Sequence, residues 1–466
     1  SGSQSIASGY RTIALGSYSS AAGDFSPAIG DRSSAGGYGS EAFGVLAKSA
    51  GRESFAGGTL ANAEGYFSTA LGLTAYTSTT ATFGTAVGQN AHATNVASTA
   101  VGASAYATGY NSAAFGNNST ASGSNSTAVG RHSVASSFDG AAFGSYATAS
   151  GTSSTALGTA SNASGIDSIA VGRFSNADGG YGVALGATAT ASGFDSIAAG
   201  GFGTTASGFL ASAFGAFANA SGDYSAAAGA FAYASGTNSL ASGRSAQASG
   251  VNSTAVGENA NASTAGATAV GGAANASGAE SSAFGTNSVA SGSNSTASGY
   301  GANAGGYSSS AFGNAANAGG NFATAVGKGA QATGTADVAL GDYASATGYY
   351  SLAAGTLSNA SGYASVALGQ QASSAGFEST ATGVLASAGG VQSTANGAFS
   401  NASGDYSVAF GLRATATNTD SSSFGKDSVS TGFGASAIGP RAHSYADDST
   451  AVGFHSATTT AGTSPP

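Results

Sequence analysis

Hydrophobic and polar positions repeat along this chain with a period of fourteen residues. The stretch from Arg244 to Gly257, RSAQASGVNSTAVG, shows the pattern plainly. Counted from one to fourteen, positions three, five and twelve are usually Ala, ten is usually Ser, seven and fourteen are usually Gly, and thirteen is usually large and apolar. The closing Gly recurs from Gly2 to Gly453, which marks out 32 units. An unbroken short repeat predicts a repeat architecture and not two or three globular domains.

The spacing of apolar residues within one unit predicts two short strands. Residues 253–257 alternate as a strand does, and residues 246–248 form a second, shorter alternating run. A helix is disfavoured, because each Gly in its interior would cost about 1 kcal/mol relative to Ala. We expect Gly250 and Gly257 to sit in tight turns, since Gly readily adopts positive φ. The units should then stack in parallel as fourteen-residue coils of an all-β solenoid.

Side-chain direction separates the inside of this solenoid from its outside. Positions ten and twelve share one face of their strand, and positions eleven and thirteen share the other. Position thirteen is Leu, Ile, Val or Phe in 24 of the 32 units, although it points away from the narrow interior of small residues. A long external apolar stripe predicts burial against another chain. The candidate interface residues are Leu15, Phe43, Phe115, Val171, Phe214, Phe284, Phe312, Val326, Leu368 and Phe410.

Two units depart from the period. Two extra residues lie near Thr79 and one lies near Phe202, but position twelve is again Ala at Ala86 and Ala213. We expect both inserts to be loops pushed outward without breaking the stack, because a shift inside a strand would turn every side chain to the wrong face. The predicted organisation is a repeat solenoid over residues 1–453 and a tail over residues 454–466.

Short motifs in the repeat resemble a known family. The runs Asn252-Ser-Thr-Ala-Val-Gly257, Asn125-Ser-Thr-Ala-Val-Gly130 and Ser365-Val-Ala-Leu-Gly369 are similar to the motif Asn-Ser-Val-Ala-Ile-Gly of the YadA-like head repeat of trimeric autotransporter adhesins. The resemblance covers nearly the whole chain. It implies a left-handed parallel β-roll, a homotrimer of three chains about one axis, and adhesion at the surface of Gram-negative bacteria.

The same resemblance implies an extracellular location, with anchoring in the outer membrane through segments that this sequence does not contain. The chain starts and stops within repeats, so we expect it to be one piece of a longer protein. Besides two identical chains, the expected partners are an extracellular matrix protein, a polysaccharide or a cell-surface ligand. With strands about 4.8 Å apart, the 32 coils would extend roughly 150 Å.

Composition argues against several other classes. Only 7% of the residues are charged, the net charge is −9, and the eleven Lys and Arg residues are dispersed, which disfavours nucleic-acid binding. The chain has no Cys and only four His residues without ligand-spaced partners, so we expect no metal, no cofactor and no catalytic residue. Asp and Glu gather at positions eight and nine, where we favour a solvated turn over cation binding. His92 and His443, at position four, should face solvent.

Aromatic residues are the more informative feature. Of the 43 Tyr and Phe residues, 20 occupy positions eight and nine, at the turn before the longer strand. Such rings either cover the corner of the roll or stack on sugars and proteins, and we favour the first interpretation. The candidate binding surface comprises four of these residues and two Asn residues of the polar column at position four, namely Tyr307, Tyr349, Tyr350, Tyr363, Asn261 and Asn275.

These patterns favour a multivalent, non-catalytic adhesin head. The alternative is a purely structural shaft of a surface filament or of a phage or viral fibre. Ice binding would need a flat, regular Thr array, but the polar column mixes Asn, Thr, Ser, Tyr and Val. The sequence does not identify a ligand.

Overall fold

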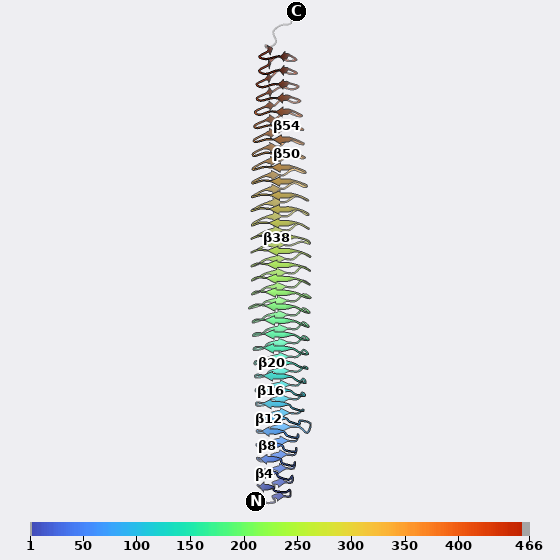
Figure 1. Ribbon diagram of the computed structural model, residues 1–466, viewed down its shortest axis with the longest axis vertical. Helices are drawn as coiled ribbons and strands as arrows, with labels where there is room; N and C mark the ends of the chain where they lie inside the picture. The colour runs from blue at the N-terminus through green and yellow to red at the C-terminus, as the bar shows by residue number, and fades with distance from the viewer. Residues whose placement is uncertain (1, 459–466) are drawn as a thin grey trace, which may run out of the picture. The chain divides into compact units, whose positions relative to one another are not determined.

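The computed structural model describes residues 2–458, and within them every regular element is a β-strand. The chain divides between Ser235 and Gly236 into two compact units, each considered by itself. Within each unit, coils stack one upon another (Figure 1). Odd-numbered strands, from β1 (Ile6–Ala7) to β65 (Ala457–Thr458), occupy positions four and five of their coils, and even-numbered strands, from β2 (Ile13–Leu15) to β64 (Thr450–Val452), occupy positions eleven to thirteen.

Each strand pairs in parallel with the corresponding strand of the next coil. Strand β36 (Thr254–Val256) lies between β34 (Leu240–Ser242) and β38 (Thr268–Val270), with Ala255 opposite Ala241 and Ala269. Strand β35 (Gln247–Ala248) pairs with β37 (Asn261–Ala262) in the other ladder. Paired residues are therefore fourteen apart, which confirms the prediction of an all-β parallel solenoid. Its handedness stays a prediction.

The interior is built from the small columns that the repeat predicts. Ala248, Ala255 and Ser253 are buried, whereas Thr254 and Val256, on either side of Ala255, are half-exposed. Many of the buried Ser hydroxyls donate to the carbonyl of the residue three positions earlier, as Ser68 Oγ does to Gly65 O at 2.7 Å. Because each coil buries only small side chains, much of the cohesion comes from backbone bonds between coils, such as Gln247 N–H to Ala260 O at 2.8 Å.

The turns differ from the sequence expectation in one respect. Gly257 has the expected positive φ, 130°, but the expectation is wrong for Gly250, which is not among the positive-φ glycines. Positive φ falls instead on Ser245 and Asn252, both at 56°, at positions two and nine. Gly250 is required for space, because a Cβ there would overlap the carbonyl of Thr264 in the next coil. The frequent Asn and Asp at position nine are the sequence signal for the left-handed conformation.

The two inserts leave the ladders intact. Strand β10 (Thr69–Leu71) pairs with β12 (Thr85–Val87) at a spacing of sixteen, and Ala70 still lies opposite Ala86. The extra residues form a small loop beside β12 (Figure 1). At the second insert, β28 (Ile197–Ala199) pairs with β30 (Ser212–Phe214) at a spacing of fifteen, and Phe202 is 65% exposed.

Deleting Thr79 and Thr80 is expected to change stability little. The loop lies outside both ladders, and its main side-chain bonds run from Ser78 Oγ and Thr80 Oγ1 to Thr94 O, at 2.7 and 2.8 Å. Extra loop residues add little closure entropy, so we expect an apparent Tm within about 3 °C of the parent in a thermal melt. A much larger fall would assign the loop a structural role.

The ladder also continues past Gly453. Strand β65 pairs with β63 (His443–Ser444), so paired residues reach Thr458. The rest of the predicted tail, residues 459–466, lies outside the described residues, and the boundary at residue 453 stays a prediction.

Candidate functional site

The described residues form no concave site. Residues 2–458 contain no pocket, and no three His, Asp or Glu side chains among them are placed to hold a metal ion. The predicted site residues lie on the outer surface of the coils. Three columns of side chains stand out on that surface: the apolar stripe at position thirteen, the aromatic corner at positions eight and nine, and the polar column at position four.

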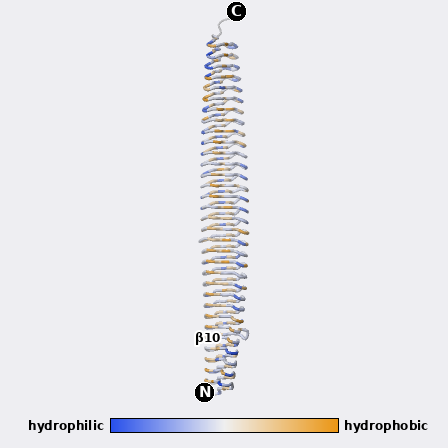
Figure 2. The backbone as a smooth tube through the Cα atoms, in the orientation of Figure 1, coloured by the Kyte–Doolittle hydropathy of each residue, from blue (hydrophilic) through white to orange (hydrophobic). Residues whose placement is uncertain are grey.

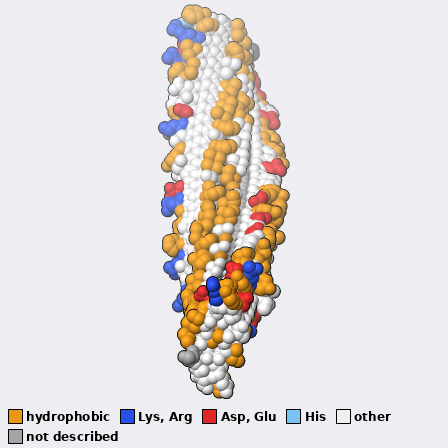
Figure 3. All heavy atoms as spheres, turned by 60° about the horizontal axis from the view of Figure 1, so that its bottom comes forward, with side chains coloured by type: hydrophobic (Ala, Val, Ile, Leu, Met, Phe, Trp, Pro, Cys, Tyr) orange, Lys and Arg blue, Asp and Glu red, His pale blue; other side chains and the backbone are white. Residues whose placement is uncertain are grey.

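The apolar stripe is exposed in both units. In the first unit, Leu15, Phe115 and Phe214 are 43%, 40% and 46% exposed. In the second unit the side chains at position thirteen lie side by side across the ladder, with Phe312 opposite Val326 in the parallel pairing. Hydrophobic side chains form orange bands on the visible face in Figure 3, and Figure 2 shows hydrophobic segments recurring from coil to coil within each unit.

The other predicted interface residues have the same orientation. All occupy the last position of their three-residue strands, where side chains point away from the Ala interior. Those that are exposed are Phe284, Phe312, Val326 and Phe410, and those that are half-exposed are Phe43, Val171 and Leu368.

The aromatic corner forms runs of touching rings. Tyr350 and Tyr363 meet edge to face with their ring centroids 5.9 Å apart, and Tyr363 stacks on Phe377 at 5.1 Å. Tyr307 meets Phe322 edge to face at 5.4 Å. Tyr307, Tyr349, Tyr350 and Tyr363 nevertheless remain 45% to 59% exposed. The rings thus pack against neighbouring coils and still present an apolar edge and a hydroxyl to the outside.

The polar column is half-buried and bonded along the stack. Asn261 Nδ2 donates to Asn275 Oδ1 at 3.2 Å, and Asn303 Nδ2 donates to Asn317 Oδ1 at 2.9 Å. These amides use part of their hydrogen-bonding capacity within the chain, so a ligand would meet only the remainder. The solenoid thus brings Asn261 and Asn275 together. It places them on a different ladder face from the aromatic corner.

The position-four His residues are less accessible than expected. His92 is half-buried, with its ring 5.0 Å from the ring of Tyr106 and 5.6 Å from that of Tyr76. Burial lowers the pKa of His92 below its ordinary value. His443 is half-buried as well. Both rings are therefore only partly accessible, because aromatic neighbours cover part of each: Tyr76 and Tyr106 beside His92, and Tyr445 of the same coil 5.7 Å from His443.

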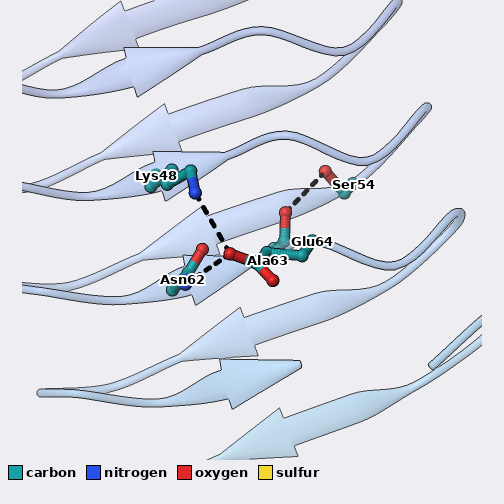
Figure 4. A network of polar contacts seen from close by, with 5 residues as sticks. All are labelled: Lys48, Ser54, Asn62, Ala63 and Glu64. Carbon is teal, nitrogen blue, oxygen red and sulfur yellow. Dashed lines mark hydrogen bonds and ion pairs between the residues drawn. The ribbon is translucent and has the colours of Figure 1, made fainter. Parts of the chain in front are cut away.

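A small ionic network in the first unit joins two residues of the same column, Lys48 and Asn62, to Glu64 at position six (Figure 4). Glu64 Oε1 accepts bonds from Lys48 Nζ at 3.1 Å and from Asn62 Nδ2 at 3.0 Å. Partial burial acts to raise the pKa of Glu64, but the bonds from Asn62 and Lys48 and the charge of Lys48 outweigh it and lower the pKa. The pKa of Tyr76 is raised by burial and by the Glu64 charge. The network stabilises a charge locally and contains no free acid–base pair.

Several acidic residues at position eight have a backbone role that the sequence did not suggest. Asp24 Oδ1 accepts the N–H of Tyr10 at 2.7 Å, and Asp447 Oδ1 accepts that of Phe433 at 2.8 Å. Each donor lies in the preceding coil, fourteen residues earlier. A carboxylate at this corner therefore satisfies a turn amide, which accounts for these residues without a bound cation.

Asp337 is the one carboxylate in the described core. It is fully buried at position ten, where Ser is usual. Its Oδ2 accepts the Gly334 N–H at 2.6 Å, and its Oδ1 accepts the Ser351 N–H and Oγ–H, both at 2.9 Å. Ser351 directly follows Tyr349 and Tyr350, so Asp337 anchors the backbone beside two candidate binding residues. A single Asp in a column of small residues was the signal for this site, and the sequence interpretation missed it.

Comparison with known proteins identifies the family of the fourteen-residue repeat. The family model of the YadA head domain repeat matches most of the chain, over residues 7–33, 49–75, 80–105, 107–133, 135–189, 206–232, 234–274, 276–302, 304–386, 388–428 and 430–456. The chain is also similar to the crystal structure of the collagen-binding domain of the Yersinia adhesin YadA, with 24% identity over 38% of this chain and 68% of that one, at a TM-score of 0.18. No curated protein sequence matches the chain. None of the described residues forms a helix long and apolar enough to cross a membrane.

Proposed function

This chain belongs to the family of YadA head domain repeats, and from that premise we propose that it is the head of a homotrimeric surface adhesin. The head binds extracellular ligands through many weak contacts and has no catalytic role. Its location is extracellular, with the anchor to the outer membrane supplied by other segments of a longer protein. The repeat is the left-handed fourteen-residue coil that the family resemblance implies.

The observation that carries the proposal is the exposed apolar stripe at position thirteen. Large side chains such as Phe284, Phe312 and Phe410 are 40% to 53% exposed in a single chain, and they recur coil after coil on one face. A soluble monomer rarely leaves so extended an apolar surface in water. Burying this face at the axis of three parallel chains removes it from solvent and leaves the corners and the polar column outside.

The ligand-binding part of the proposal rests on the aromatic corner. Exposed Tyr and Phe rings recur along this corner, and no pocket is present among residues 2–458. A ligand that contacts many of these rings at once must itself be long and repetitive, so a matrix protein or a polysaccharide is the suitable class of ligand. The collagen-binding domain of YadA is a family precedent for a fibrous matrix ligand. Affinity would accumulate over many patches, each of which contributes a small share.

Replacing Tyr307, Tyr349, Tyr350 and Tyr363 together by Ser should reduce adhesion about tenfold or more while leaving the assembly intact. Each exposed ring offers a surface for stacking that Ser lacks, so the expected loss of binding free energy is the sum of four small contributions. The measurement is binding of the purified assembly to immobilised collagen, fibronectin and host polysaccharide, with sedimentation to verify the oligomer.

Single Tyr→Phe variants at the same positions are the matched control, since they keep the ring and remove only the hydroxyl. Each should bind within about twofold of the parent. If the fourfold Ser variant adheres as well as the parent, the array proposal fails and the segment is better described as a structural shaft. Loss of all binding from one single variant would point to one discrete site.

A further inference from the structure

Most charged residues segregate by sign between the two turns of the coils. The exceptions at these turns are Asp31, Glu258, Asp342 and Asp427 at positions one and two, and Arg11 and Arg52 at positions eight and nine. Eight of the eleven Lys and Arg residues lie at positions one and two, here named the basic corner: Arg32, Arg131, Arg173, Arg244, Lys328, Arg413, Lys426 and Arg441. Twelve of the twenty Asp and Glu residues lie at positions eight and nine, the acidic corner: Asp24, Glu53, Asp139, Asp167, Asp195, Asp223, Glu280, Glu378, Asp405, Asp420, Asp447 and Asp448. Asp at position eight accepts a turn amide, and Asp at position nine suits positive φ, but neither role explains why Lys and Arg gather at the opposite turn.

The two corners do not pair within one chain. They are the turns at the two ends of every coil, separated by the strands at positions four to five and eleven to thirteen. Four ion pairs occur among residues 2–458, and none joins a basic-corner residue to an acidic-corner residue. Two of them, Arg244 with Glu258 and Arg413 with Asp427, pair a basic-corner residue with an exposed or half-exposed acid of the same corner in the next coil. In Figure 3, the blue side chains lie along one edge with a few red ones beside them, and most of the other red side chains lie toward the opposite edge, with hydrophobic bands between.

In three of the eight coils that carry a basic-corner residue, an acidic-corner residue lies at the same level of the stack. In the first unit Arg131 and Asp139 belong to the same coil, and both are exposed. In the second unit Arg413 shares a coil with Asp420, and Arg441 shares one with Asp448; these four side chains and Lys426, in the coil between, are exposed. Two parallel copies in register would bring such a basic residue of one chain close to the acidic residue of the same coil in the other chain.

The position of the corners relative to the apolar stripe determines which copies can pair. The strand that carries position thirteen connects the two corners, so the corners flank the stripe on either side. When parallel chains turn this face toward a common axis, the basic corner of each chain meets the acidic corner of the next. When two chains face each other in antiparallel orientation, like corners meet, and acidic residues oppose acidic residues.

We infer that the acidic and basic corners form the seam between neighbouring chains of a parallel assembly and reject antiparallel pairing. The inference rests on the proposed homotrimer and adds which edges meet in it. The apolar stripe supplies most of the attraction, while the corners set orientation and register. Electrostatic complementarity of this kind selects partners more than it adds affinity, and like-charge contacts disfavour the wrong arrangement.

The first test is zero-length carbodiimide cross-linking of the full chain, assembled from a mixture of nitrogen-15-labelled and unlabelled protein. The seam predicts an amide bond between Lys426 of one chain and Asp420, Asp447 or Asp448 of another, seen by mass spectrometry as a peptide pair with one labelled half. Cross-links between Lys426 and basic-corner acids of another chain, such as Asp427 or Asp342, would overturn the inference.

The second test is charge reversal with rescue. Two double variants reverse the charges of one corner each: Lys426→Glu with Arg441→Glu, and Asp420→Lys with Asp448→Lys. Each should raise the dissociation constant of the assembly about tenfold or more at low salt, because two surface pairs are reversed at every seam. The chain with all four changes should recover to within about threefold. The control replaces Asp420 and Asp448 by Asn. Both positions have positive φ, which short polar side chains such as Asp and Asn tolerate, so the control removes the charges without straining the backbone.

The outcomes separate this inference from the proposed function. A parent chain that sediments as a monomer contradicts the trimer itself. A trimer that forms normally, but whose reversed pairs fail to rescue each other, contradicts only the seam. Loss of the reversal effect at about 0.5 M salt supports the seam, because exposed charges are screened within a few ångströms at that ionic strength.

Discussion

Gly320→Ala is expected to destabilise the second unit by about 3 kcal/mol or more, since overpacking against an unyielding backbone is among the costliest single changes. A Cβ at residue 320 would lie 2.5 Å from the carbonyl carbon of Gly334 in the next coil and closer still to its oxygen. The carbonyl is part of the backbone of the next coil, so one of the two turns would have to shift to make room. Chemical denaturation of the parent and variant, followed by circular dichroism, measures the difference.

The adjacent glycine provides the matched control. A Cβ at Gly319 would approach only Asn317 Oδ1, at 3.7 Å, and Gly319 has no positive φ. Gly319→Ala should therefore be neutral or stabilise by up to about 1 kcal/mol, because it restricts the unfolded chain. Equal destabilisation by the two variants would show that flexibility, and not the distance between coils, explains glycine at position seven.

Replacing Phe284, Phe312 and Val326 together by Asp should dissociate the assembly. Full burial of each large side chain contributes about 1.5–3 kcal/mol, and a buried unpaired carboxylate adds a desolvation cost. The three residues lie in β40 (Ser282–Phe284), β44 (Ser310–Phe312) and β46 (Thr324–Val326), where their backbone pairing does not depend on the side chain. Sedimentation velocity should show a trimer for the parent and smaller species for the variant.

A control with three added charges on the opposite ladder distinguishes an interface from a general effect of charge. Gln331→Asp, Asn359→Asp and Ser387→Asp change position four in β47 (Gln331–Ala332), β51 (Asn359–Ala360) and β55 (Ser387–Ala388). This chain should sediment as the parent does. If it dissociates equally, or if the stripe variant stays assembled, position thirteen does not form the interface.

The fold could be derived from the sequence because the same pattern of Gly and alternating small residues is repeated in nearly every coil. Gly at fixed intervals and a strand alternation such as Ser253, Ala255 and Gly257 admit only one register, and a slip by one residue would expose the Ala column. The return of Ala at Ala86 and Ala213 after each insert predicted that the ladders continue, and they do. The same alternation also placed Phe284 and Phe312 on the outside.

Other features depend on distances between coils, which no single unit contains. The sequence shows that Gly is usual at position seven, but only the closeness of the Thr264 carbonyl explains why Gly250 stands there. Positive φ at Ser245 and Asn252 belongs to the turns, and the frequent Asn and Asp at position nine were its signal in the sequence. Asp337 looks like an exception in sequence, and only stacking brings Ser351 close enough to bond its buried carboxylate.

The sequence by itself therefore determined the period, the parallel stack and the division between inside and outside, because side-chain alternation in a strand is a local property. The tertiary structure alone decided which groups meet across coils. It brings Tyr350 against Tyr363, Asn261 against Asn275 and Tyr10 N–H against Asp24, pairs thirteen or fourteen residues apart in the chain. It also separates the basic and acidic corners at the two ends of each coil, because stacking in register turns a residue position into a continuous edge.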